Sequence, residues 1–193
     1  SVKLNSADFQ KGGFEFSDSL QVVQWLEAAS VDLIEISGGT YEQPRFLTLE
    51  GIEPVTDQNV AASTAAREAY FVDFGTAMQA HVNIPLMVTG GFRRRDAMEQ
   101  AMQMGATDAI GLARPLCLMT DAPNALLDGA EVLPRYETGL GLIPSWLGWL
   151  RRSNLVKTID GFSGTYWFYQ QIWLLGTRGA ANETFSVFKA FMI

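Results

Sequence analysis

Four short apolar runs, separated by segments with helical periodicity, limit the possible folds of this 193-residue chain most strongly. The clearest run is VDLIEIS at residues 31–37, which is nearly continuous and rich in branched side chains. Such a run is typical of a strand buried within a parallel sheet. Three further strands are predicted over residues 2–5, 84–89 and 108–112.

Three helices are predicted between these strands, because apolar residues recur there every three or four positions. The first covers residues 18–29 after an N-cap at Ser17, the second residues 64–80, and the third residues 96–104 with Gly105 just beyond its end. The order of strands and helices predicts an α/β fold with a parallel sheet and helices outside it. The residues expected to face inward are Val22, Val23, Leu26 and Ala29; Tyr70, Phe74, Ala77 and Met78; and Met98, Ala101 and Met102.

The chain is short for a closed (β/α)₈ barrel, which typically needs roughly 250 residues. It also starts at a strand-like segment, so we expect a fragment of a longer protein that supplies part of a barrel. The last third is rich in aromatic residues and predicts a C-terminal helical extension whose aromatic side chains pack into a core. Docking of a membrane surface or a partner is the alternative for these aromatic residues.

Composition excludes several function classes. A net charge of −7 argues against a nucleic-acid surface, and the short clusters at residues 93–95 and 151–152 are interpreted as solvated helix termini. The single cysteine, Cys117, excludes an intramolecular disulfide and is expected to be a buried, inert thiol. No signal peptide is visible, and the apolar stretch at residues 162–176 is too short to span a bilayer. We therefore expect a soluble, cytoplasmic protein with no membrane partner.

Small residues follow two consecutive predicted strands and indicate a phosphate site. Gly90 and Gly91 end one strand, and Ala113 and Arg114 end the next. Small residues let backbone N–H groups approach an anion, and arginine offers a planar fork that matches phosphate oxygens. In barrels the phosphate site is often built after the last two strands. The alternative is two ordinary strand–helix turns.

Two other strand positions are candidates for ligand contacts. Lys3 lies inside an otherwise apolar strand, and an inward-pointing ammonium needs an anion or a polar ligand. A flavin ring, which becomes negative near N1 on reduction, is one such ligand; pairing with Glu35 or simple exposure are the alternatives. Ser37, Gly38 and Tyr41 end the second strand and open a long loop, where they line a substrate pocket or form a structural turn.

Histidine and cysteine chemistry is not expected. His81 is the single histidine and lies between a helix and the following strand, at the end of a barrel opposite the active site. We expect it on the surface. With one histidine and one cysteine, neither a transition-metal site of these ligands nor a Ser-His-Asp triad can be assembled.

Taken together, these segments resemble the old yellow enzyme family of NADH:flavin oxidoreductases. The matching segments are VKLNSADF at residues 2–9, GGF at 12–14, VDLIEISGG at 31–39, REAYF at 67–71, PLMVTGG at 85–91 and DAIGLARP at 108–115. The resemblance implies that residues 1–131 supply strands five to eight of a TIM barrel that binds FMN, with residues 132–193 as the extension.

The resemblance also implies roles for particular residues. Lys3 stands where the family usually has an arginine that contacts the flavin ring, and Gly90, Gly91, Ala113 and Arg114 stand at the family's phosphate contacts. The substrate-binding His/His or His/Asn pair and the tyrosine proton donor of the family lie on or near strand four, which this sequence does not include. The catalytic residues therefore stay unknown.

The implied activity is transfer of hydride from NADH or NADPH through FMN to a small-molecule acceptor. The acceptor expected from the resemblance is the C=C bond of an α,β-unsaturated carbonyl compound. The alternative is a non-catalytic half-barrel or assembly unit that binds FMN weakly or not at all. Because a half-barrel leaves two open sheet edges, a homo-oligomer is possible.

Overall fold

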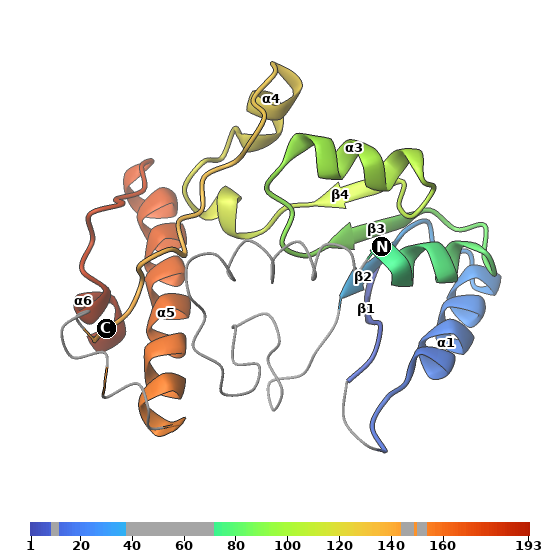
Figure 1. The fold of residues 1–193 in the computed structure, drawn as a ribbon, viewed down its shortest axis with the longest axis horizontal. Coiled ribbons are helices and arrows are strands. Elements are labelled where there is room, and N and C mark those ends of the chain that lie inside the picture. Colours follow the sequence, from blue (N-terminus) through green and yellow to red (C-terminus); the bar gives the residue numbers. More distant parts are fainter. Residues whose placement is uncertain (9–11, 38–71, 144–148, 150–153) are drawn as a thin grey trace. The chain divides into compact units, whose positions relative to one another are not determined.

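The computed structural model describes residues 1–8, 12–37, 72–143, 149 and 154–193 (Figure 1). These residues fall into two compact units that divide between Leu112 and Ala113. The first contains the sheet and the second contains the C-terminal helices. The predicted barrel region and extension, with their boundary at residue 131, stay a prediction about the whole protein.

The first unit is built on a four-stranded parallel sheet. Its strands are β1 (Val2–Asn5), β2 (Ile34–Ser37), β3 (Leu86–Thr89) and β4 (Ala109–Gly111), and they lie side by side in chain order. All three pairings are parallel, which confirms the predicted α/β class. Three of the four strands are shorter than their apolar runs.

The two faces of this sheet differ in character, because successive side chains of a strand point to opposite faces. One face carries Ile34, Ile36, Leu86 and Val88, each at most 1% exposed. The other carries Lys3, Glu35, Ser37 and Thr89, all partly accessible. The first face is therefore packed in a hydrophobic core, and the second is the more polar one among the described residues.

The helix before β2 begins earlier than predicted. Helix α1 covers Phe16–Ala28, and its N-cap is Glu15 rather than Ser17. A capping box forms instead: the Glu15 side chain accepts from the backbone of Asp18, and the backbone N–H of Glu15 donates to Asp18 Oδ2 at 2.9 Å. Val23 is buried as predicted, whereas Ala29 is exposed, because the helix ends before it.

Two further helices flank β3 in the sequence. Residues 72–79 are helical and bury Met78, while Ala77 is exposed, contrary to the prediction. Helix α3 (Arg95–Gln103) buries Met98 and Ala101, but Met102 is 48% exposed. Gly105 follows α3 with φ +67°, a conformation that favours glycine and confirms the predicted C-terminal stop.

The second unit is helical. It contains the 3₁₀ helix η2 (Arg114–Cys117), α4 (Ala122–Leu127), the long α5 (Asn154–Arg178) and α6 (Val187–Met192). Trp167 and Phe168 of α5 pack with Ala190 of α6 in a hydrophobic cluster, and α6 lies beside α5 in Figure 1. The prediction that aromatic residues form a core is confirmed for Trp167 and Phe168. It is wrong for Tyr169 and Trp173, which are more than half exposed.

Helix α5 does not have the character of a membrane span. Among the described residues, no helix combines the length and the apolar content needed to cross a bilayer. One reason is Gln171, which is fully buried in the middle of α5 and makes two hydrogen bonds there.

Gln171 should be needed for the stability of the second unit. Its Nε2 donates to the carbonyl of Asn182 at 2.9 Å, and its Oε1 accepts from the backbone N–H of Asn182 at 2.7 Å. Gln171→Leu would leave both backbone groups without these partners, at a cost of about 2–4 kcal/mol. Urea unfolding followed by circular dichroism measures this cost. Gln170→Leu is the control, and equal midpoints for the two variants would contradict the assignment.

Candidate functional site

The carboxyl ends of the four strands bring polar and small residues to one edge of the sheet. Asn5 pairs with Ser37, and Thr89 pairs with Gly111, in the parallel register. A Cβ added to Gly111 would lie 1.8 Å from Thr89 Oγ1, so the Thr89 side chain occupies the space above Gly111. Ligands of parallel α/β folds bind at this edge, which makes it the candidate site.

Lys3 forms an ion pair on the polar face of the sheet, the face that carries Glu35, Ser37 and Thr89. Its Nζ lies 2.7 Å from Oε1 of Glu35, its register partner on β2. The Lys3 side chain is 56% exposed and that of Glu35 is 20% exposed. The structure therefore shows the pairing with Glu35 that the sequence left open as an alternative. A contact between Lys3 and a flavin stays a prediction.

The environment of Glu35 keeps its carboxyl group ionised. Partial burial by itself raises the pKa of Glu35, but the hydrogen bond from Lys3, with contributions from Thr89 and from the Lys3 charge, lowers this pKa below its ordinary value of 4.5. The negative charge is consequently maintained at neutral pH.

This shift predicts a pH dependence of stability. Because the folded-state pKa of Glu35 is depressed, the ion pair stabilises the fold fully above pH 4.5 and loses this contribution as the pH falls through the folded-state pKa. The contribution should be about 0.5 kcal/mol, since water screens the exposed Lys3. Comparing urea unfolding of the wild type and Glu35→Gln measures it. The difference should be present at neutral pH and absent in acid; a constant difference would contradict the prediction.

The loop after β3 has the backbone conformation expected of a glycine-dependent turn. Gly91 has φ +73°, in the left-handed region that side chains other than glycine rarely adopt. Phe92 and Arg93 follow, and both are buried. The interpretation of Arg93 as part of a solvated helix terminus is wrong: it is 5% exposed and donates from Nη1 to the carbonyl of Phe92 at 2.8 Å. Tertiary packing of the loop, which the sequence does not reveal, buries it.

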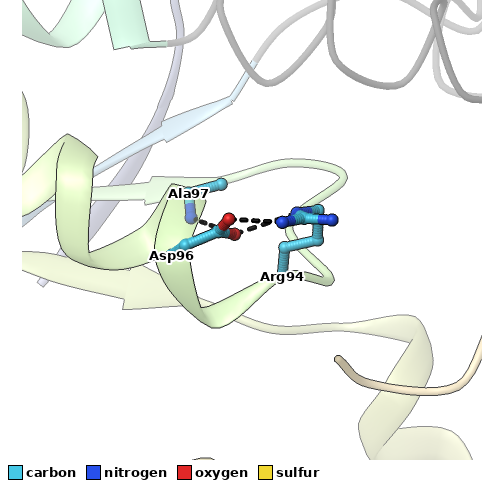
Figure 2. A network of polar contacts seen from close by, with 3 residues as sticks. All are labelled: Arg94, Asp96 and Ala97. Carbon is cyan, nitrogen blue, oxygen red and sulfur yellow. Dashed lines mark hydrogen bonds and ion pairs between the residues drawn. The ribbon is translucent and has the colours of Figure 1, made fainter. Parts of the chain in front are cut away.

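The interpretation as solvated termini is confirmed for Arg94 and Arg95. Figure 2 shows Asp96, in the first turn of α3, between the Arg94 guanidinium and the backbone N–H of Ala97, which donates to Asp96 Oδ1 at 2.8 Å. The hydrogen bond from Arg94 is the main reason why the pKa of Asp96 lies below its ordinary value. Arg95 pairs with Glu99 one turn further, at 2.7 Å. A carboxylate thus accepts one backbone N–H at the start of α3.

Ala113 and Arg114 belong to the second unit. Ala113 is the exposed N-cap of η2, and Arg114 is its half-buried first residue. Arg114 Nη1 lies 3.8 Å from Glu137 Oε1. Cys117, at the end of η2, is half-buried, and burial raises the pKa of its thiol, which supports an unreactive role. Because Gly90 and Gly91 lie in the other unit, the joint phosphate site of these residues stays a prediction.

The substrate candidates are only partly described. Ser37 is half-buried at the end of β2, and its carbonyl accepts from the backbone N–H of Ser6 at 2.7 Å. Gly38 and Tyr41 lie outside the described residues. His81 is exposed, as predicted. Within the described residues, no group of His, Cys, Asp or Glu side chains could hold a metal ion.

A polar pair at the end of β1 was not predicted from the sequence. Asn5 Nδ2 donates to Asp8 Oδ1 at 2.5 Å, and Asp8 Oδ2 accepts from the backbone N–H of Phe14 at 3.0 Å. Asn5 Oδ1 is buried and has no hydrogen-bond partner within the described part of the chain. This leaves a buried acceptor at the carboxyl edge that a ligand could satisfy. The available signal was a second polar residue in the strand VKLN, two positions after Lys3.

A parallel sheet with helices and a polar carboxyl edge defines the chain as an α/β protein of the kind that binds ligands at its strand ends. Curated proteins of similar sequence indicate a more specific class of protein. The chain is 38% identical to NADH-dependent flavin oxidoreductase iliE of Neonectria sp. (strain DH2), over 72% of the chain and 17% of that relative. It is 32% identical to NADH-dependent flavin oxidoreductase iccE of Talaromyces variabilis, over 86% of the chain and 39% of the relative. Over most of its length the chain is thus similar to a part of these NADH-dependent flavin oxidoreductases.

The chain spans less than two fifths of the length of these relatives. A solved structure of 2-naphthoyl-CoA reductase in complex with 2-naphthoyl-CoA superimposes on 66% of the chain and 17% of that protein, with a TM-score of 0.52 and 22% sequence identity. This likeness supports the fold alone. No family model matches the sequence.

Proposed function

We propose that the whole protein is an FMN-dependent oxidoreductase that uses NADH or NADPH to reduce an activated C=C bond, such as that of an α,β-unsaturated carbonyl compound. Within it, this chain supplies strands five to eight of the barrel. The observation that carries the proposal is the match to curated NADH-dependent flavin oxidoreductases over most of the chain. When bound, FMN supplies the hydride-transfer chemistry.

The described residues fit such a cofactor on two observations. The left-handed Gly91 leaves no side chain between the loop amides and an anion, which suits a phosphate. The buried acceptor Asn5 Oδ1 lacks a partner among the described residues, and the flavin ring carries an N–H that could donate to it. Lys3 and Asn5 would face the ring, and Gly90, Gly91, Ala113 and Arg114 would hold the phosphate.

On this proposal, the residues of this chain bind the cofactor and the acceptor and stabilise charge. The Lys3 ammonium would stabilise negative charge on the ring, and the Arg114 guanidinium would bind phosphate oxygens. Ser37, Gly38 and Tyr41 would line the acceptor pocket. No proton donor is assigned from this chain.

A non-catalytic half-barrel is the second candidate, and two contacts favour it. Lys3 is ion-paired with Glu35, and Arg114 lies close to Glu137, so both proposed ligand cations already have carboxylate neighbours. Such neighbours reduce the attraction of each cation for an anionic cofactor. Weak or absent FMN binding would follow.

FMN loading distinguishes the two candidates. The purified protein is incubated with FMN, desalted and examined by visible absorbance. A retained and shifted flavin band that bleaches anaerobically on addition of NADH or NADPH is expected for the oxidoreductase. A colourless protein would instead support the non-catalytic half-barrel. Reoxidation by an α,β-unsaturated ketone, compared with its saturated analogue, then tests the acceptor class.

A further inference from the structure

The polar face of the sheet carries neighbouring polar side chains on β1, β2 and β3. Lys3 and Glu35 are register partners, and their charged groups lie 2.7 Å apart. Thr89 lies on β3, two residues beyond Met87, which is the register partner of Glu35. Its side chain helps to lower the pKa of Glu35 and extends over Gly111 of β4. The Lys3 ammonium is therefore the hydrogen-bond partner that holds the Glu35 carboxylate, whereas Thr89 Oγ1 makes no hydrogen bond within the described residues.

Lys3 depends on this carboxylate for its position. A lysine ammonium is a compact charge on a flexible four-carbon stem, so it takes a defined place only where a partner holds it. Lys3 is more than half exposed, and Glu35 is its closest charged partner in the described structure. Without Glu35, no carboxylate would hold the ammonium in this place or offset its charge.

We propose that Glu35 is a positioning residue that holds the Lys3 ammonium against the sheet and so limits the positive charge that Lys3 presents to a bound flavin. This inference rests on the proposed function. A cation close to the ring favours the reduced, negatively charged flavin over the oxidised one, and a carboxylate 2.7 Å from that cation partly cancels its field. Releasing Lys3 from Glu35 should therefore raise the flavin potential.

The ion pair itself is tested without any flavin. In the full chain, the Glu35 carboxyl carbon is followed by NMR during a pH titration of the wild type and Lys3→Met. Removing the ammonium leaves the effect of burial uncompensated, so the pKa of Glu35 should rise above its value in the wild type. An unchanged pKa would overturn the proposal at this stage.

The effect on the cofactor is tested by redox titration of the FMN-loaded protein. Glu35→Gln should favour binding of reduced over oxidised flavin about tenfold, equivalent to a rise of about 30 mV for a two-electron couple. Glu35→Asp, which keeps the charge, should restore most of the wild-type potential. In the Lys3→Met background, Glu35→Gln should have less than about a third of this effect, because no ammonium is left to release.

The outcomes separate this inference from the proposed function. If the wild type binds no FMN, the proposed function and the inference both fail. If FMN binds but Glu35→Gln leaves the potential unchanged, the inference alone fails. It also fails if Glu35→Gln shifts the potential equally with and without Lys3, because Glu35 would then act directly and not through Lys3.

Discussion

Gly75→Ala is expected to destabilise the first unit by about 3 kcal/mol or more. The added Cβ would lie 2.1 Å from the carbonyl oxygen of Ala106 and 3.3 Å from Val88 Cγ2. Ala106 is fully buried, and its N–H donates to Ala101 of α3 at 3.0 Å. Because the clash is with backbone, no side-chain rotation can relieve it.

A second helical glycine provides a matched control for this variant. Gly176 in α5 has no atom within 4 Å of an added Cβ, so Gly176→Ala should stabilise its helix by up to about 1 kcal/mol. Urea unfolding followed by circular dichroism compares the two variants with the wild type. Opposite shifts of the midpoint are expected. A Gly75→Ala protein as stable as the wild type would show that the helix over residues 72–79 does not approach Ala106 so closely.

Arg114→Ala is expected to weaken FMN binding about 10- to 100-fold in the loaded protein. A hydrogen bond to a charged group contributes about 1.5–3 kcal/mol, and each 1.4 kcal/mol corresponds to tenfold in affinity. Removing the guanidinium also leaves Glu137, now 3.8 Å from Arg114, near the phosphate. Fluorescence quenching of FMN during titration with the protein measures the affinity.

Two variants show whether the Arg114 effect is specific. Arg95→Ala removes an arginine that is ion-paired with Glu99 at the start of α3, and it should leave FMN affinity unchanged. Riboflavin lacks the phosphate, so its affinity should be the same in the wild type and Arg114→Ala. If Arg114→Ala binds FMN as tightly as the wild type, the phosphate assignment is wrong.

The elements of the sheet could be predicted from the sequence because they depend on local pattern. The apolar runs at residues 2–5 and 84–89 contain β1 and β3, and the glycine after α3 adopts the predicted left-handed conformation. The start of α1 was predicted wrongly. Serine is a preferred N-cap residue, so Ser17 was expected to begin the helix, but the reciprocal Glu15–Asp18 capping box makes Glu15 the N-cap.

The exposure of individual side chains could be predicted less well. Arg93 and Arg94 are neighbours of the same type, yet one is buried and the other lies on the surface. Similarly, Phe168 is buried and Tyr169, the next residue of α5, is exposed. Composition predicts the same exposure for such neighbours. Their exposure differs because the loop or helix packs only one of the two side chains against the rest of its unit.

The sequence by itself determined the α/β class, the strand-end positions of the candidate ligand residues and the similarity to flavin oxidoreductases, because these follow from periodicity and from motifs that are contiguous in the chain. Only the tertiary structure decided how the polar strand residues are used. Lys3 and Glu35 lie 32 positions apart in the chain, and the parallel register of β1 and β2 brings their charges to 2.7 Å. The register of a strand pair is set by the packing of whole strands and helices. The sequence alone therefore could not decide between the Lys3–Glu35 ion pair, a ligand contact and simple exposure of Lys3.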